Sequence, residues 1–403
     1  MAPQLDVEGI VTALAWMLLG ASLLGMLAWR LRVPYAVALV LAGLLVEETH
    51  LLNLPQLEPR VLLFVLLPPL LFDAAFRLDE RELQSVAQAV LFLAVPGTVA
   101  TAVIVALVLV LALSLSFPVA LLFGSIVAAT DPVAVVGVFR NVGAPTRLAV
   151  IAEGESLIND GVAITLYTVT IGLVTAGAAD VAGALELFAR EVVGGVAVGV
   201  ILGVMFSRLT AIVDDHLIEM TLSTALAYGS YLAAQSIDTS GALACVAAGL
   251  IHGSYGREVG MSTRTRRLLD DLWEYFGFVG NAVVFLLVGF TASLASLVAS
   301  GGAVLVSIVI VFAARVLVVA GPPLLVHMSR RVQAVTSRAE RAVLIWGGLR
   351  GALTITLALA LPAGLPERQL LIAMAFGVVL FTLLVQGITL SLLVRRVGLA
   401  EAK

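Results

Sequence analysis

The sequence predicts an all-α, polytopic membrane protein, and three observations support this fold class. Hydrophobic residues make up 61% of the 403-residue chain and charged residues only 12%, whereas soluble domains have roughly 45–50% apolar and about 25% charged residues. Apolar runs near the ~20 residues that a spanning helix needs recur along the whole chain. The basic residues between these runs fall almost entirely on alternate loops. So few charges cannot cover a water-facing surface, so lipid must cover most of it.

About thirteen spans are expected from the apolar runs. The runs begin near Val7, Tyr35, Val61, Ser85, Pro118, Leu148, Glu191, Leu217, Ser240, Leu272, Val304, Ala342 and Leu370. The run between residues 85 and 117 is long for one helix, so it is expected to be tilted or bent. The first run has no basic segment before it, which favours a retained helix over a cleaved signal peptide. Residues 1–403 are expected to form one membrane transport domain with no soluble domain.

The basic residues predict an orientation. Eighteen of the 23 Lys and Arg residues, from Arg30 to Lys403, fall on one side of the membrane, and only Arg60, Arg190 and Arg368 fall on the other. Because positive loops stay in the cytoplasm, the N-terminus is expected outside and the C-terminus inside.

Composition and motifs exclude several classes of function. No basic stretch is long enough to suggest nucleic acid, and the net charge is only −4. The single cysteine, Cys245, rules out an intrachain disulfide framework. No His/Cys cluster suits zinc, and no Gly-rich phosphate loop suggests that ATP powers the chain. Neither an enzyme activity nor a cofactor is expected.

Seven charged residues fall inside predicted spans, where each costs at least ~2.5–3.5 kcal/mol at the helix centre. They are Asp73, Asp131, Glu153, Glu155, Asp160, Arg315 and Arg350. All but one of the acids lie between residues 131 and 160. Charged residues inside spans usually mark an ion pathway.

The segment Thr130-Asp131-Pro132 predicts a helix broken within the membrane. Pro132 lacks an N–H, so the carbonyl of Ala128 loses its partner, and the residue before a proline is pushed away from helical angles. The break leaves carbonyl oxygens and a hydroxyl beside the Asp131 carboxylate, and such hard oxygen ligands suit a small alkali cation. A proline kink with a capping Asp is the alternative.

A second group of acids follows on the next span. Ser156 and Asp160 share one helix face, whereas Glu155 points toward a different neighbour. We therefore expect Asp160 and Ser156 to form a site, with a purely structural Asp160 as the alternative. Glu155 is expected to pair with a buried cation, for which Arg315 is favoured and Arg350 is the alternative.

A second break is predicted at Trp346–Leu353, where three glycines surround Arg350. Glycine permits unwound backbone, and a guanidinium can satisfy the exposed carbonyls at a helix C-terminus. Two interrupted helices, one in each half of the chain, are typical of a transporter's substrate site. Pro132 and Arg350 are thus expected to support the breaks, with close packing of small residues as the alternative.

Two further polar residues are weaker candidates. Asp73 lies near a helix end, where it is either a surface acid or a gate to the site. Asn281 is expected to form an interhelical hydrogen bond rather than to bind a ligand.

Several motifs together resemble one family. They are Ala129-Thr-Asp-Pro-Val-Ala-Val-Val136, Gly143-Ala-Pro-Thr146, Glu153-Gly-Glu-Ser-Leu-Ile-Asn-Asp-Gly161, Phe285-Leu-Leu-Val-Gly289, Phe312-Ala-Ala-Arg-Val316 and Gly347-Gly-Leu-Arg-Gly-Ala352. As a set they resemble the NhaP-type sodium/proton antiporters of the monovalent cation:proton antiporter family, which is related to animal sodium/proton exchangers. The resemblance covers nearly the whole membrane domain.

The resemblance implies an inverted-repeat antiporter fold with two broken, crossing helices. It implies that the ion-binding residues are Asp160, Asp131, Thr130 and Ser156, which would hold Na⁺, with Asn159 in support and Asp73 drawn into the site. Relatives often carry Glu at the position of Asp73. The resemblance also implies a Glu155–Arg315 ion pair. It further implies a homodimer, in which core helices around 61–175 and 270–395 move against dimerisation helices around 7–50 and 185–255.

The implied activity is exchange of Na⁺ or Li⁺ for H⁺ across a prokaryotic cell (inner) membrane. Both ions would compete for a buried carboxylate whose access alternates, and the neutral Asn159 beside Asp160 suggests electroneutral, one-for-one exchange. The alternative is K⁺/H⁺ exchange. Two other classes are disfavoured. An ion channel would need a continuous polar pore, which the sequence does not indicate, and an intramembrane aspartyl protease would carry its acids in different local motifs.

Overall fold

The computed structural model describes residues 7–31, 34–49, 64–176, 181–291, 294–320 and 336–400. Within these ranges the regular elements are helices and none is a strand, which confirms the all-α fold class. The predicted start of the span near Val61 lies outside the described residues, as does Arg60.

In the first half of the chain, a helix or a helix pair occupies each described apolar run. These elements are α1 (Val7–Leu31), α2 (Tyr35–Thr49), α4 (Leu67–Arg77), α5 (Glu80–Ala94), α6 (Pro96–Leu113), α7 (Phe117–Ala128), α8 (Pro132–Val142) and α9 (Thr146–Ala176). The bend expected between residues 85 and 117 occurs at Val95, between α5 and α6. Pro96 begins α6, where its missing N–H would have no helical partner in any case.

The second half continues in the same way, with two π-helical turns, η1 and η3, within it. Its elements are α10 (Val181–Thr210), α11 (His216–Ser236), α12 (Gly241–Ile251), η1 (His252–Gly256), α13 (Arg257–Val259), α14 (Thr263–Thr291), α15 (Leu294–Ala299), α16 (Gly301–Ala320), α18 (Arg338–Trp346), α19 (Ala352–Leu359), α20 (Arg368–Phe381), η3 (Thr382–Gly387) and α21 (Ile388–Arg396). Among the described residues, seven helical stretches are long and apolar enough to cross a membrane. The count of thirteen spans therefore stays a prediction.

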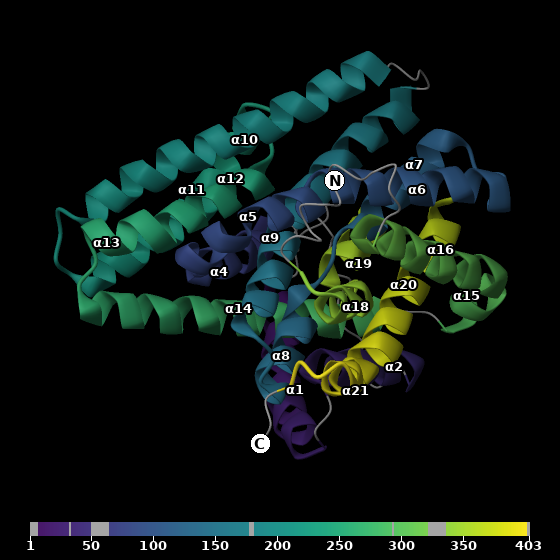
Figure 1. The fold of residues 1–403 in the computed structure, drawn as a ribbon, viewed down its shortest axis with the longest axis horizontal. Helices are drawn as coiled ribbons and strands as arrows, with labels where there is room; N and C mark the ends of the chain where they lie inside the picture. The colour runs from purple at the N-terminus through teal and green to yellow at the C-terminus, as the bar shows by residue number, and fades with distance from the viewer. Residues whose placement is uncertain are drawn as a thin grey trace.

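Small residues let several helices approach one another closely. Along α10, Gly195 and Gly199 face the backbone of Ser240 and Ala244, with which an added Cβ would collide. The helices α2 and α14 approach in the same way, as is common where helices pack without large side chains between them. Figure 1 shows α10, α11, α12 and α14 on one side of the molecule, and α15, α16 and α20 on the other.

The functional region lies where these two sides meet. Helix α9 packs against α5 and α7, and it carries Asp160 at its middle. The helix pairs α7/α8 and α18/α19 are both interrupted, and their unwound segments lie beside α9 and each other. The geometry of these two breaks defines the site.

Candidate functional site

The first break lies between α7 and α8. Helix α7 ends at Ala128 and α8 begins at Pro132. Ala129 (ψ 143°) and Asp131 (φ −103°, ψ 115°) have extended backbone, as expected for the residue before a proline. The Asp131 carboxylate accepts a hydrogen bond from the Val133 N–H at 2.9 Å, so it also caps the N-terminus of α8.

The second break lies between α18 and α19 and touches the first. It extends from Trp346, the last residue of α18, to Ala352, the first of α19. The Asp131 N–H donates to the Leu349 carbonyl oxygen at 2.8 Å, which joins the two unwound segments. At Gly351 an added Cβ would overlap the Asp131 carboxylate, so a side chain there would force the segments apart. The N-termini of α8 and α19 therefore meet at Asp131, where their dipoles favour a negative charge.

Arg350 closes the C-terminal end of α7. The residue is 1% exposed, and its guanidinium donates to the carbonyl oxygens of Val127 at 2.5 Å and Gly348 at 2.7 Å. Its backbone N–H donates to the Thr382 hydroxyl of η3 at 3.1 Å. Arg350 thus satisfies a carbonyl that the interrupted helix leaves without a helical partner, which is the role expected from its glycine-rich surroundings.

A buried ion pair joins Glu155 to Arg315, residues that are 2% and 7% exposed. Nη1 of Arg315 contacts Oε1, and Nη2 lies 3.0 Å from Oε2, which is a bidentate arrangement. Arg315 also donates to the Leu344 carbonyl oxygen, from Nη2 at 3.0 Å and Nε at 3.3 Å. Arg315 therefore caps the C-terminal end of α18, as Arg350 caps that of α7. Within the described residues, Glu155 makes its ion pair with Arg315 and not with Arg350.

Two residues of α9 hold the first break in place. The Asn159 amide donates to the Thr130 hydroxyl at 2.8 Å and accepts from the Thr130 N–H at 3.3 Å. The Ser156 hydroxyl donates to the Thr130 carbonyl oxygen. All three residues are buried. Ser156, expected from the sequence to bind the ion, thus contacts the unwound backbone and does not line the neighbouring cavity.

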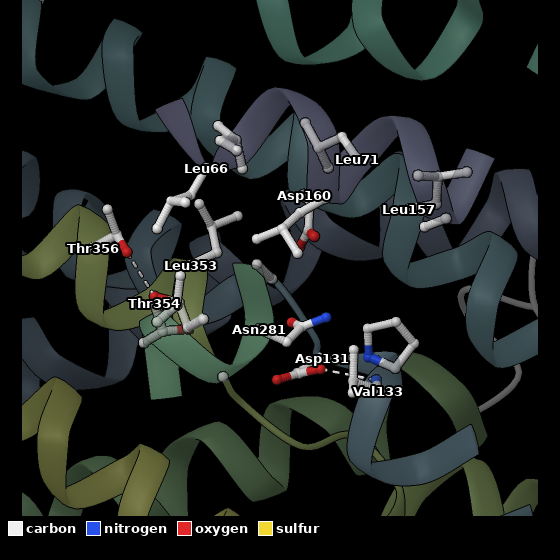
Figure 2. Close-up of a pocket in the computed structure, with 18 of the residues that line it drawn as sticks. Leu66, Leu71, Asp131, Val133, Leu157, Asp160, Asn281, Leu353, Thr354 and Thr356 are labelled. Atoms are coloured by element: carbon white, nitrogen blue, oxygen red, sulfur yellow. Dashed lines mark hydrogen bonds between the residues drawn. The ribbon is translucent and has the colours of Figure 1, made fainter. Parts of the chain in front are cut away.

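A cavity of about 120 Å³ lies beside the two breaks. Three carboxylates line it, those of Asp73 on α4, Asp131 and Asp160, and Figure 2 shows Asp131 and Asp160 in the same space. No described group donates a hydrogen bond to the Asp160 carboxylate, and the charge that acts on it is that of Asp131. Thr130 and Asn281 also line the cavity.

Asn281 corrects one expectation from the sequence. Its amide donates to the Gly277 carbonyl oxygen at 2.8 Å, so this hydrogen bond stays within α14 instead of joining two helices. The physical reason is that α14 presents this face to the cavity, which Asn281 lines.

Asp73 lies at the cavity wall and carries its own counter-charge. The Arg77 Nε, one turn further along α4, lies 2.7 Å from its carboxylate, and Arg77 also reaches Glu274 on α14 at 3.3 Å. At Gly277 an added Cβ would overlap the Asp73 carboxylate. The structure thus places Asp73 with the other acids of the cavity. The sequence signal for its pairing with Arg77 was their i,i+4 spacing on one helix.

The sequence analysis missed two hydroxyl groups of the cavity wall. Thr354 and Thr356, both on α19, line the cavity and lie to one side of the two carboxylates in Figure 2. The Thr356 hydroxyl donates to the Ala352 carbonyl oxygen at 2.9 Å, whereas the Thr354 hydroxyl is buried without a partner among the described residues. The carbonyl of Arg350, one turn before Thr354, accepts from Thr382 instead. Their place just after the glycine-rich segment was the available signal.

Together these features define a class of protein. Two interrupted helices meet at a cavity, half-helix N-termini point at one carboxylate, and a second carboxylate has no partner among the described residues. This is the arrangement of a secondary transporter for a small cation. The sequence model described as "Sodium/hydrogen exchanger, transmembrane" matches residues 18–396. The chain therefore belongs to the sodium/hydrogen exchanger family.

Individual relatives agree with this assignment. The chain is 38% identical over 369 residues to the Na(+)/H(+) antiporter ApNhaP of Aphanothece halophytica, an alignment that covers 91% of this chain and 70% of the relative. It is 38% identical over 356 residues to the Na(+)/H(+) antiporter NhaP of Pseudomonas aeruginosa, with 84% and 81% covered. The sodium proton antiporter MjNhaP1 of Methanocaldococcus jannaschii has the same fold, with a TM-score of 0.79 at 20% identity over 97% of this chain and 100% of that one. The resemblance inferred from the motifs is confirmed.

Proposed function

We propose that this chain exchanges Na⁺ for H⁺ across the membrane by secondary active antiport. The observation that carries the proposal is the Asp160 carboxylate, which lines the cavity between the interrupted helices and has no hydrogen-bond donor among the described residues. Either a proton or a cation can neutralise such a carboxylate, but not both at once. Their competition for one group couples the two fluxes when access to the site alternates.

Sodium is the proposed cation because relatives at 38% identity bear the name Na(+)/H(+) antiporter. Asp160 is the proposed common site of Na⁺ and H⁺, with Asp131 and Thr130 as further oxygen ligands. Asn159 and Ser156 hold Thr130 in the unwound conformation that such a role needs, and their hydrogen bonds to Thr130 support this assignment.

The proposed mechanism divides the molecule into two units that move against each other. The core contains α5–α9 and α16–α21, and the scaffold contains α1, α2, α4 and α10–α14. The ranges expected from the sequence placed α4 and α14 in the core. We assign them to the scaffold instead, because α4 packs along α12 and α14 packs along α2. The cavity then lies between the units, with Asp73 and Asn281 on the scaffold and Asp131 and Asp160 on the core. Rocking of one unit against the other alternates access to these groups.

The same proposal includes a homodimer formed through the scaffold, with the N-terminus outside and the C-terminus in the cytoplasm of a prokaryotic cell. Large apolar side chains are exposed along α1 and α10, among them Trp16, Leu23, Leu185 and Ile201, which suits contact with lipid or with a second copy. The orientation rests on the distribution of arginines between the predicted loops.

Transport by the purified protein in proteoliposomes tests the proposed activity. With an acidic interior and an internal pH-sensitive dye, external Na⁺ should relieve quenching by driving protons out. Parallel additions of Li⁺ and K⁺ measure selectivity. A response to K⁺ that equals or exceeds the response to Na⁺ would identify K⁺/H⁺ exchange instead, and no response to any of the three would overturn the proposal.

One-for-one exchange is expected to move no net charge. If one Na⁺ replaces one H⁺ at Asp160, the moving core carries equal charge in both directions. An electrogenic exchanger would gain about 2.3 kcal/mol per net charge at ~100 mV. We therefore expect a K⁺/valinomycin potential to leave the balance between the Na⁺ and H⁺ gradients unchanged.

The measurement is a reversal assay in proteoliposomes. Na⁺ and pH gradients of equal size are oriented so that their driving forces oppose each other through the exchanger. They should then give no net proton flux at any imposed voltage. Flux that persists at equal gradients and changes sign with voltage would contradict one-for-one exchange without contradicting antiport.

A further inference from the structure

Arg77 neutralises one of the three acids that line the cavity. Its Nε lies 2.7 Å from Oδ1 of Asp73, and its Nη2 donates to Oδ2 at 3.4 Å. Its Nη1 lies 3.3 Å from Glu274 on α14. Among the described residues, no basic side chain acts in this way on Asp131 or Asp160. The three acids of the cavity thus differ in their partners, and among the described residues Asp73 is the one that is paired with a guanidinium.

We propose that Arg77 is a tethered counter-cation, which occupies the Asp73 carboxylate until a transported cation displaces it and thereby sets the apparent affinity for Na⁺. This inference rests on the proposed Na⁺/H⁺ exchange and deepens it. Arg77 contacts Asp73 rather than the transported ion, so it is a positioning residue.

The exposure of the pair makes this exchange of partners feasible. The Asp73 side chain is 10% exposed and faces the cavity, whereas that of Arg77 is 32% exposed. The Arg77 guanidinium therefore competes with a cation in the cavity for the Asp73 carboxylate. Partly exposed ion pairs one turn apart on a helix are weak, however, so a cation in the cavity can replace one.

Glu274 gives the displaced guanidinium a second partner. Its side chain is 67% exposed and already lies 3.3 Å from Arg77. When a cation neutralises Asp73, Arg77 can remain paired with Glu274 at the surface. Arg77 therefore exchanges one carboxylate partner for another and does not form a fixed structural ion pair.

Removing Arg77 should make the wall of the cavity around Asp73 more negative. Asp73 and Glu274 would lose their shared guanidinium, and Glu153 also acts electrostatically on Asp73. Because clustered negative charge raises the local concentration of cations, Na⁺ should bind more tightly. A purely structural Arg77 predicts lower stability instead, with no gain in affinity.

The test compares Arg77→Gln, Arg77→Lys and the unaltered protein in proteoliposomes, at one alkaline pH where protons compete least. Arg77→Gln is expected to lower the apparent KM for Na⁺ roughly two- to fivefold, the range that a partly exposed ion pair provides, without raising kcat. Arg77→Lys keeps the charge and should retain the KM of the unaltered protein. The matched control is Arg190→Gln, which removes one charge from the exposed Arg190–Asp238 pair at 3.8 Å and should leave KM unchanged.

Glu274→Gln is an independent variant in case Arg77→Gln fails to fold, since Glu274 is largely exposed. Without its second partner, Arg77 should hold Asp73 more firmly and raise the KM for Na⁺. An unchanged or raised KM in folded Arg77→Gln overturns the inference, as does a KM in Arg77→Lys as low as in Arg77→Gln, or an unchanged KM in Glu274→Gln. The unaltered protein separates two failures, because absent exchange there overturns the proposed function, whereas normal exchange with these results overturns only the role of Arg77.

Discussion

Asp160→Asn is expected to abolish Na⁺/H⁺ exchange while the protein still folds and inserts. Asparagine keeps the shape of the side chain, but it can neither ionise nor release a proton. Because no described residue hydrogen-bonds to the Asp160 carboxylate, the isosteric substitution breaks no such bond and should leave the melting temperature close to its original value. The measurement combines Na⁺-driven proton flux in proteoliposomes with a thermal melt of the same preparation.

Asp238→Asn is a matched control for this experiment. Its side chain is 89% exposed, and its backbone has φ 53°, a conformation that asparagine also tolerates. The control should exchange Na⁺ at the rate of the unaltered protein. A monodisperse Asp160→Asn protein that still exchanges at a near-normal rate would rule out Asp160 as the common site of Na⁺ and H⁺.

Arg315→Ala should destabilise the protein by about 3–5 kcal/mol, because it leaves Glu155 as an unpaired buried charge. It also removes the donor to the Leu344 carbonyl at the end of α18. Removing Glu155 in the same molecule takes away the unpaired charge, so the double variant with Glu155→Ala should recover part of the loss. The measurement is the melting temperature and the folded yield in detergent for both single variants and the double variant.

Arg350 provides the control for this coupling. Its guanidinium is held by the carbonyl oxygens of Val127 and Gly348, so Glu155→Ala should not rescue Arg350→Ala. Additive losses in the Glu155/Arg315 double variant would count against their pairing as a stabilising unit. Rescue of Arg350→Ala instead would assign the buried charge of Glu155 to Arg350.

The breaks in the helices could be predicted from the sequence because their causes are local. Pro132 disrupts its own helix wherever that helix packs, and it also forces Asp131 into extended backbone. The glycines around Arg350 act in the same way, and an arginine among them has few ways to satisfy its charge. The all-α class followed from composition alone. The helix face of Glu155 predicted a buried cationic partner on the side away from Asp160, and Arg315 was favoured for this role with Arg350 as the alternative.

Other parts of the site depend on contacts between distant helices, which a single sequence does not reveal. Ser156 shares a face with Asp160, yet its hydroxyl contacts the Thr130 carbonyl instead of the cavity, because the unwound segment lies against α9 at that depth. The sequence also could not show that the Thr354 hydroxyl would be buried without a partner among the described residues. The proposed placement of α4 and α14 with the scaffold rests in the same way on packing between distant helices.

Because Arg350 caps the C-terminal end of α7, the site can be completed only late in protein synthesis. Val127 and Arg350 are 223 residues apart, and Glu155 and Arg315 are 160 apart. At a synthesis rate of ~5–20 residues per second, the C-terminal end of α7 is synthesised roughly 10 to 45 seconds before Arg350. Until Arg350 is made, the end of α7 keeps an open carbonyl, and until Arg315 is made, Glu155 has no partner for its charge. The last translated helices therefore complete the structure of the first ones, and a ribosome that stalls before Arg350 leaves a membrane-inserted chain that cannot close its own site.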